Sequence, residues 1–184
     1  MIHIDAKKVI EARIAESMGF ADYRRIMETV REVDVSVDPG FQRTFNAFYR
    51  VRRGAEWRKT YYDLFERSKS GKPAFESIIG ALFEATGNIE ASFSSKMLAT
   101  LDPDMPIWDS YVVRNLCLEL NGKTKEDRLR CAVGLYDRMI EWYDAFLRSA
   151  NGRECIAEFD RVLPGCVWMS GVKKIDFYLW SIRN

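Results

Sequence analysis

The chain reads Phe75-Glu76-Ser77-Ile78-Ile79-Gly80-Ala81-Leu82-Phe83 at its most clearly patterned stretch. The apolar residues of this stretch recur at intervals of three and four, which places them on one face of an α-helix. The same spacing recurs through most of the chain, in Trp57, Tyr61, Leu64 and Phe65; Val112, Val113, Leu116 and Leu120; Leu129, Val133, Tyr136, Ile140, Tyr143 and Leu147; and Ile175, Tyr178, Leu179 and Ile182. Only Val33–Val37 alternates as a strand would. The sequence therefore predicts an all-α protein of about eight to ten helices.

Turn-forming residues separate these helical stretches. We expect a long helix to start at Thr124, and the last helix, around Val172–Ile182, to pack into the core. The predicted breaks are Asp38-Pro39-Gly40, Ser70-Gly71-Lys72-Pro73, Thr86-Gly87-Asn88, Asp102-Pro103-Asp104, Asn121-Gly122 and Pro164-Gly165. None resembles a long linker, so we expect one helical domain over residues 1–184, packed as one globule or as two closely joined lobes.

Composition limits the class of protein. The chain has 184 residues and is 47% hydrophobic, which allows a sizeable core. We expect no membrane association and a cytoplasmic location, because no apolar run approaches the roughly 18–20 residues of a membrane span and Met1–Asp5 lacks the apolar part of a signal peptide. The four cysteines are far apart and His3 is the only histidine, which does not fit a zinc site. We therefore expect buried free thiols and neither metal nor cofactor.

Positive charge is concentrated in one segment, although the net charge is only +1. Between Phe41 and Thr60 there are six basic residues and one acid, Glu56, which gives a local charge of +5; the basic residues are Arg43, Arg50, Arg52, Arg53, Arg58 and Lys59. Aromatic residues are interleaved with them, as on surfaces that bind phosphates and stack bases. This pattern predicts that Arg50, Arg52, Arg53 and Arg58 hold nucleic-acid phosphates. A solvated helix face, with Phe45, Phe48 and Tyr49 in the core, is the alternative.

A lysine and an aspartate each stand near the start of a predicted helix. Lys96 follows Ser92 and Ser94, where a helix dipole lowers the pKa of an amine and favours the neutral form needed for Schiff-base chemistry. Asp109 precedes an apolar helix and could serve as a base or stabilise positive charge. Each residue also has a simpler role, because a lysine beside core residues extends its amine to water and an aspartate is a preferred helix cap.

The order of these features resembles the helix-hairpin-helix DNA glycosylase superfamily. In that family a glycine-containing hairpin precedes a lysine, and a loop then leads to a motif with a catalytic aspartate. Here Ser92-Phe93-Ser94-Ser95-Lys96 matches the hairpin and lysine, with serines in place of both glycines. Ile107-Trp108-Asp109-Ser110-Tyr111-Val112 matches the aspartate motif, and Arg114 follows it. The match covers mainly residues 74–120, and no iron–sulfur cysteine cluster follows.

The resemblance implies a DNA glycosylase and lyase, a hydrolase that acts on a modified or damaged base, or an inactive relative. Lys96 would attack the sugar, and Asp109 would assist deprotonation and stabilise positive charge on the sugar. The DNA would be contacted by Ser92, Ser94 and Arg114. A flipped base would enter a cleft between the two helical halves, where Trp108 or Tyr111 would stack on it. The second hypothesis is a non-catalytic helical module that binds nucleic acid or protein. In that case Lys96 is a solvated charge and Asp109 is a cap.

Overall fold

The computed structural model describes residues 2–13 and 19–182, which form ten α-helices and a short 3₁₀ turn but, within these ranges, no strand. The all-α prediction is therefore confirmed. Contacts divide the chain into two units. Gly19–Leu101 forms the central unit, and Met1–Met18 together with Asp102–Asn184 forms the terminal unit.

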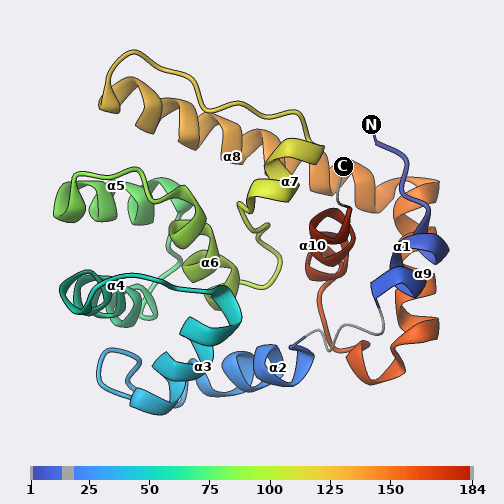
Figure 1. The fold of residues 1–184 in the computed structure, drawn as a ribbon, viewed down its shortest axis with the longest axis horizontal. Coiled ribbons are helices and arrows are strands. Elements are labelled where there is room, and N and C mark those ends of the chain that lie inside the picture. The colour runs from blue at the N-terminus through green and yellow to red at the C-terminus, as the bar shows by residue number, and fades with distance from the viewer. Residues whose placement is uncertain (1, 14–18, 183–184) are drawn as a thin grey trace. The chain divides into compact units, whose positions relative to one another are not determined.

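The central unit is held together by an aromatic core. Its helices are α2 (Phe20–Thr29), α3 (Pro39–Tyr49), α4 (Ala55–Ser68), α5 (Phe75–Thr86) and α6 (Ala91–Leu101). Helix α3 packs against α2, and α5 packs against both α4 and α6 (Figure 1). Five fully or almost fully buried rings meet between α3 and α4: Phe41, Phe45, Tyr61, Tyr62 and Phe65. Burial of each such side chain contributes about 1.5–3 kcal/mol, so these rings anchor both helices.

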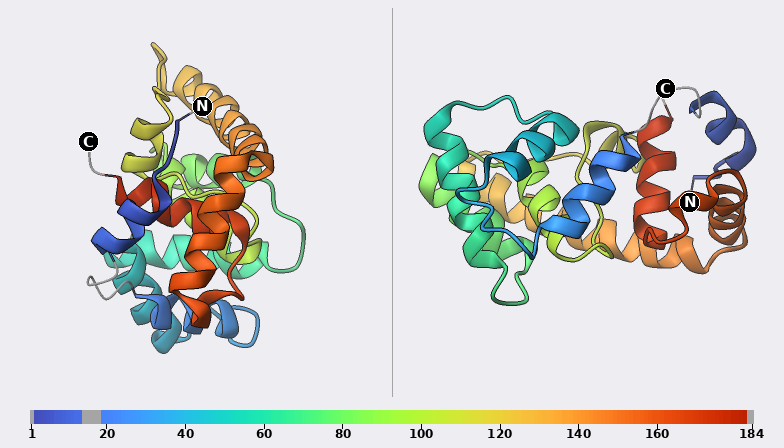
Figure 2. Two further views of the ribbon diagram at one scale, coloured as in Figure 1. Left: turned by 90° about the vertical axis from the view of Figure 1, so that its right-hand side faces the viewer. Right: turned by 90° about the horizontal axis from the view of Figure 1, so that it is seen from below.

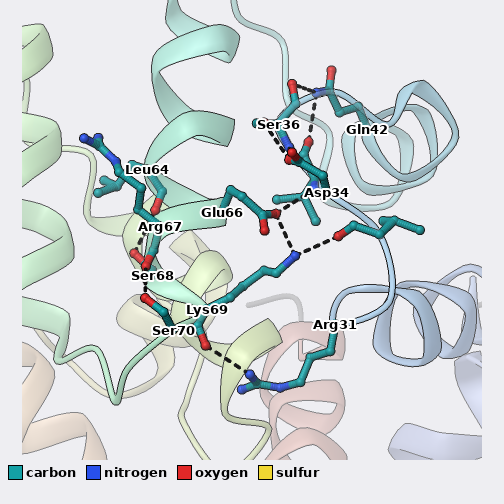
Figure 3. Close-up of polar contacts among 12 residues, drawn as sticks. Arg31, Asp34, Ser36, Gln42, Leu64, Glu66, Arg67, Ser68, Lys69 and Ser70 are labelled. Atoms are coloured by element: carbon teal, nitrogen blue, oxygen red, sulfur yellow. Dashed lines mark hydrogen bonds and ion pairs between the residues drawn. The ribbon is translucent and has the colours of Figure 1, made fainter.

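The segment Val33–Val37 forms turns rather than a strand. The carboxylate of Glu66 accepts a hydrogen bond from the Val35 backbone N–H at 2.8 Å, and the Lys69 amine donates to the Val33 carbonyl at 2.7 Å (Figure 3). Lys69 and Glu66 also pair with each other at 2.6 Å. The Gln42 amide also donates to the Val35 and Ser36 carbonyls, at 2.9 Å each. Because side chains bond these backbone groups, they need no neighbouring strand.

The terminal unit is arranged around its last helix. Its elements are α1 (Ala6–Arg13), α7 (Ser110–Asn115), α8 (Lys125–Arg148), α9 (Ala150–Val162), the 3₁₀ turn η1 (Pro164–Cys166) and α10 (Gly171–Ser181). Helix α10 contacts α1, α7, α8 and α9 (Figures 1 and 2). Ile175, Tyr178 and Leu179 are completely buried, which confirms that the last helix packs into a core.

Local sequence explains where the long helix α8 begins and ends. The helix starts after Thr124, as the sequence predicts, and Thr124 and Asp127 form a capping box there. Ser149 ends α8 and caps α9, and its hydroxyl accepts a hydrogen bond from the Gly152 N–H at 2.9 Å. A side chain at Gly152 would collide with the Phe146 carbonyl, so this tight corner requires glycine.

Two further features concern the class of protein. None of the helices in the described ranges is long and apolar enough to cross a membrane. The four cysteines are free, and Cys155 and Cys166 are buried as expected. The expectation of buried thiols is wrong for Cys117, which is exposed, and for Cys131, which is half-buried.

Candidate nucleic-acid interface

The predicted phosphate-binding arginines lie in and around the connection between α3 and α4 in the central unit. Arg50 ends α3 in the left-handed conformation, with φ of 54°, and Arg52 follows in the irregular segment before α4. Both side chains are exposed, and neither forms a hydrogen bond or ion pair with any residue that the structure describes. Arg58, on α4, is half-buried. Arg50 and Arg52 are therefore the two cations of this group best placed to meet a phosphate.

Arg53 has a different environment, because an acid from another helix pairs with it. Its guanidinium donates to the Glu90 carboxylate at 2.8 Å, and Glu90 is only 4% exposed. The indole N–H of Trp57 donates to the other oxygen of the same carboxylate at 3.1 Å. The pair neutralises most of the charge of Arg53, so this residue is less available to a phosphate than Arg50 or Arg52.

The aromatic residues interleaved with the arginines belong mainly to the core. Phe45 is completely buried and Tyr49 is 7% exposed, while Phe48 is half-buried and stacks on Tyr23. Phe45 and Tyr49 therefore lie in the core, as the alternative for this segment predicts, whereas Phe48 is only partly covered. Trp57 and Phe93 are half-buried and lie beside Arg53.

Lys96 is half-buried against aromatic rings of the central unit. Its amine donates to the Tyr49 carbonyl at 3.4 Å and lies 5.1 Å from the ring centre of Phe93 and 5.8 Å from that of Tyr49. A carbonyl oxygen and two ring faces all stabilise the protonated amine. The neighbourhood of Lys96 therefore favours a cation over a neutral nucleophile.

The two serines compared above with hairpin glycines lie inside a helix. Helix α6 begins at Ala91, before Ser92 and Ser94, so Lys96 is more than one turn from the helix start. Ser94 is completely buried, and its hydroxyl has no hydrogen-bond partner among the described residues. Ser92 is half-buried. The turn between α5 and α6 instead uses Gly87, whose φ of 67° suits glycine.

Asp109 caps a helix in the terminal unit. It is half-buried, and its carboxylate accepts a hydrogen bond from the Tyr111 N–H at 2.8 Å at the start of α7. Trp108 beside it is 8% exposed. The exposed Arg114 lies over the half-buried ring of Tyr111 at 5.8 Å. The capping role of Asp109 is therefore confirmed.

A buried polar network that the sequence did not predict holds the loop that carries Asp109. The carboxylate of Asp176, on α10, accepts hydrogen bonds from the Tyr143 hydroxyl and from the Ile107 N–H, the latter at 3.3 Å. Tyr136 donates to the Pro106 carbonyl at 2.7 Å. Asp176 is 5% exposed, and burial raises its pKa to about 6. These contacts fix the backbone just before Asp109.

Lys173 adds positive charge to this network. Burial lowers the pKa of its amine, while the nearby carboxylates of Asp176 and Asp109 oppose that change. Asp176 and Lys173 stand three residues apart on one face of α10. The signal in the sequence was the pair Lys173 and Lys174 followed by Asp176 within a mainly apolar helix.

The candidate residues thus fall into two groups. Arg50, Arg52, Arg53, Arg58, Ser92, Ser94 and Lys96 belong to the central unit, and Trp108, Asp109, Tyr111 and Arg114 belong to the terminal unit. That Lys96 and Asp109 line one cleft, as the glycosylase hypothesis requires, stays a prediction. Within the described ranges no group of three or more histidine, cysteine, aspartate or glutamate side chains is placed to hold a metal ion.

Comparisons of this chain with protein-family models, with curated proteins and with solved structures gave no match.

Proposed function

We propose that this protein binds nucleic acid, with DNA as the expected ligand, through the arginines that connect α3 and α4. The observation that carries the proposal is that Arg50 and Arg52 are exposed and have no partner within the described residues. Several surface arginines elsewhere pair with an acid on their own helix, as Arg24 does with Glu28 and Arg161 with Glu158. Unpaired guanidinium groups retain their full charge and their hydrogen-bond donors for a phosphate.

The phosphate contacts should number about three. Arg50, Arg52 and the half-buried Arg58 remain after the pairing of Arg53 with Glu90 is taken into account. Three neutralised phosphates give a slope of the logarithm of affinity against the logarithm of salt concentration near −2.7 for a duplex and about −2.1 for a single strand. Four contacts would give about −3.6 for a duplex.

Fluorescence anisotropy with labelled single-stranded and duplex oligonucleotides over a range of salt concentrations tests this proposal. We expect saturable binding at low salt that weakens along these slopes. No binding to either ligand at low salt would reject nucleic-acid binding through this surface.

A DNA glycosylase and lyase activity is the second candidate. It is supported by the chain order of Lys96 on α6, a loop, and an aspartate that caps α7. In this reaction the neutral Lys96 amine bonds to the sugar C1′ carbon, the bond from C1′ to the base breaks, and the base leaves with a proton. The sugar ring then opens to the Schiff base. The amine must first lose its proton, which the contacts with Tyr49 and Phe93 oppose.

Borohydride trapping on duplexes that contain damaged bases tests the second candidate. We expect a covalent adduct that disappears in Lys96→Gln and persists in Lys173→Gln. Loss in Lys173→Gln alone would instead assign the reaction to the amine near Asp109, and no adduct with the unaltered protein would remove the catalytic proposal.

A further inference from the structure

Arg53 lies in a fixed position over two aromatic rings. Its guanidinium carbon is 5.3 Å from the ring centres of both Trp57 and Phe93, and those two centres are 4.8 Å apart. The buried carboxylate of Glu90 binds both the guanidinium and the Trp57 indole. We call Arg53, Trp57, Phe93 and Glu90 the Arg53 platform.

In the Arg53 platform the Arg53 side chain is held by several contacts but is still partly exposed to solvent. The hydrogen bond and the two ring contacts restrict the side chain, yet 40% of it remains exposed. A guanidinium is flat and weakly hydrated, and it stacks on aromatic faces. Because Glu90 neutralises its charge, the stacking surface of Arg53 matters more than its attraction for phosphate.

The unpaired arginines stand directly beside this platform in the chain. Arg52 precedes Arg53, and Arg50 is three residues away, a span of at most about 11 Å. Phosphate contacts and a stacking surface therefore lie within reach of one short strand.

We propose that the Arg53 platform stacks an unpaired nucleobase while Arg50 and Arg52 hold the adjoining phosphates, so that the preferred ligand is single-stranded nucleic acid. This inference rests on the proposed function and adds the form of the ligand. In a duplex the faces of the bases are covered by their neighbours, and the platform has nothing to stack on. In a single strand each base can offer a face, whatever its sequence.

The test compares two oligomers that have the same phosphates and differ in their bases. One is a thymidine dodecamer, and the other is a dodecamer of abasic tetrahydrofuran units. Stacking of a base on a protein side chain strengthens binding about fivefold or more. We expect the unaltered protein to bind the thymidine oligomer at least about fivefold more tightly than the abasic one, and more tightly than a duplex of equal length.

Arg53→Lys is the informative variant, because lysine retains the charge and can pair with Glu90 but lacks the flat surface. We expect its preference for the thymidine oligomer to fall close to one, with abasic affinity unchanged. Arg67→Lys, an exposed site on α4, is the matched control and should retain the full preference.

Equal affinity of the unaltered protein for both oligomers, a preference that survives in Arg53→Lys, or tighter binding to the duplex would each overturn the platform while leaving nucleic-acid binding in place. Failure to bind any of the three ligands at low salt would overturn the proposed function as well.

Discussion

Asp176 provides the sharpest prediction about stability, because its carboxyl group is buried within the terminal unit. Burial is the largest cause that raises its pKa from 3.8 to about 6. The Lys173 amine, the Tyr143 hydroxyl and the Ile107 N–H lower the pKa, and Asp109 raises it further. The folded protein therefore holds a proton on Asp176 more tightly than the unfolded chain does.

The sign of the pH dependence follows from this difference. The stabilisation is complete below the unfolded pKa of 3.8 and is lost as the pH rises through about 6. At about 1.36 kcal/mol per pKa unit, the difference between 3.8 and about 6 corresponds to a loss of about 3 kcal/mol in the free energy of unfolding across this window.

Replacement of Asp176 by asparagine removes the titrating group and leaves an oxygen that can accept the same hydrogen bonds. As the pH rises from low to neutral, we expect the unaltered protein to lose about 3 kcal/mol of unfolding free energy relative to Asp176→Asn. Other carboxylates, such as Asp127 and Glu158, titrate in both proteins and cancel in the difference.

Denaturant unfolding at several pH values between about 3.5 and 7.5 provides the measurement. A difference that stays constant with pH, or one that changes in favour of the unaltered protein, would refute the argument. Carbon NMR of the Asp176 carboxyl group gives a direct check on the unaltered protein, with a midpoint near 6 expected. A midpoint near 4 would show that burial does not control this group.

Three further predictions concern other parts of the chain. Deletion of residues 172–184 should unfold or aggregate the protein, because α10 forms the core of the terminal unit; a truncated protein with unchanged thermal stability would contradict this. Arg50→Gly should leave the free energy of unfolding unchanged or raise it by up to about 1 kcal/mol, because glycine accepts a φ of 54° without strain, yet it should weaken nucleic-acid binding; a clear loss of stability would disprove the strain argument. Asp109→Ala should cost about 1 kcal/mol of stability through the lost cap, and Asp109→Asn less; if both variants leave turnover of a damaged duplex unchanged, Asp109 is only a cap.

Local patterns in the sequence were sufficient to predict much of the fold. Helical spacing predicted α5, α8 and α10, and Thr124 predicted the start of α8, because these signals lie within a few residues of one another. The start of α6 at Ala91 differs from the serines first considered, because the backbone at Ser94 bonds to the Glu90 carbonyl.

Contacts between distant residues could not be predicted in the same way. Arg53 and Glu90 are 37 residues apart, and Asp176 and Ile107 are 69 apart. The residues next to Glu90 or Asp176 in the sequence do not indicate which group each acid binds, because each contact depends on how the helices pack. The Val33–Val37 segment alternated like a strand, but Glu66 on α4 and Lys69 just after α4 bind its backbone.

The sequence also predicted the basic segment, but not that its arginines have different environments. Arg50, Arg52 and Arg53 are equivalent by composition, and only the packing of Glu90 separates Arg53 from the other two. Because Arg53 pairs with Glu90, the expected number of phosphate contacts falls from four to about three, and Arg53 is proposed instead as a stacking surface.

Charge reversal tests the central claim most directly. The double variant Arg50→Glu and Arg52→Glu lowers the net charge by four, and Lys123→Glu with Lys125→Glu lowers it equally at exposed positions of the terminal unit. We predict that the arginine variant loses most of its single-strand affinity and that its salt slope falls from about −2.1 to about −0.7, while the lysine variant retains the unaltered slope. Equal losses in the two variants, or unchanged binding by the arginine variant, would contradict the account.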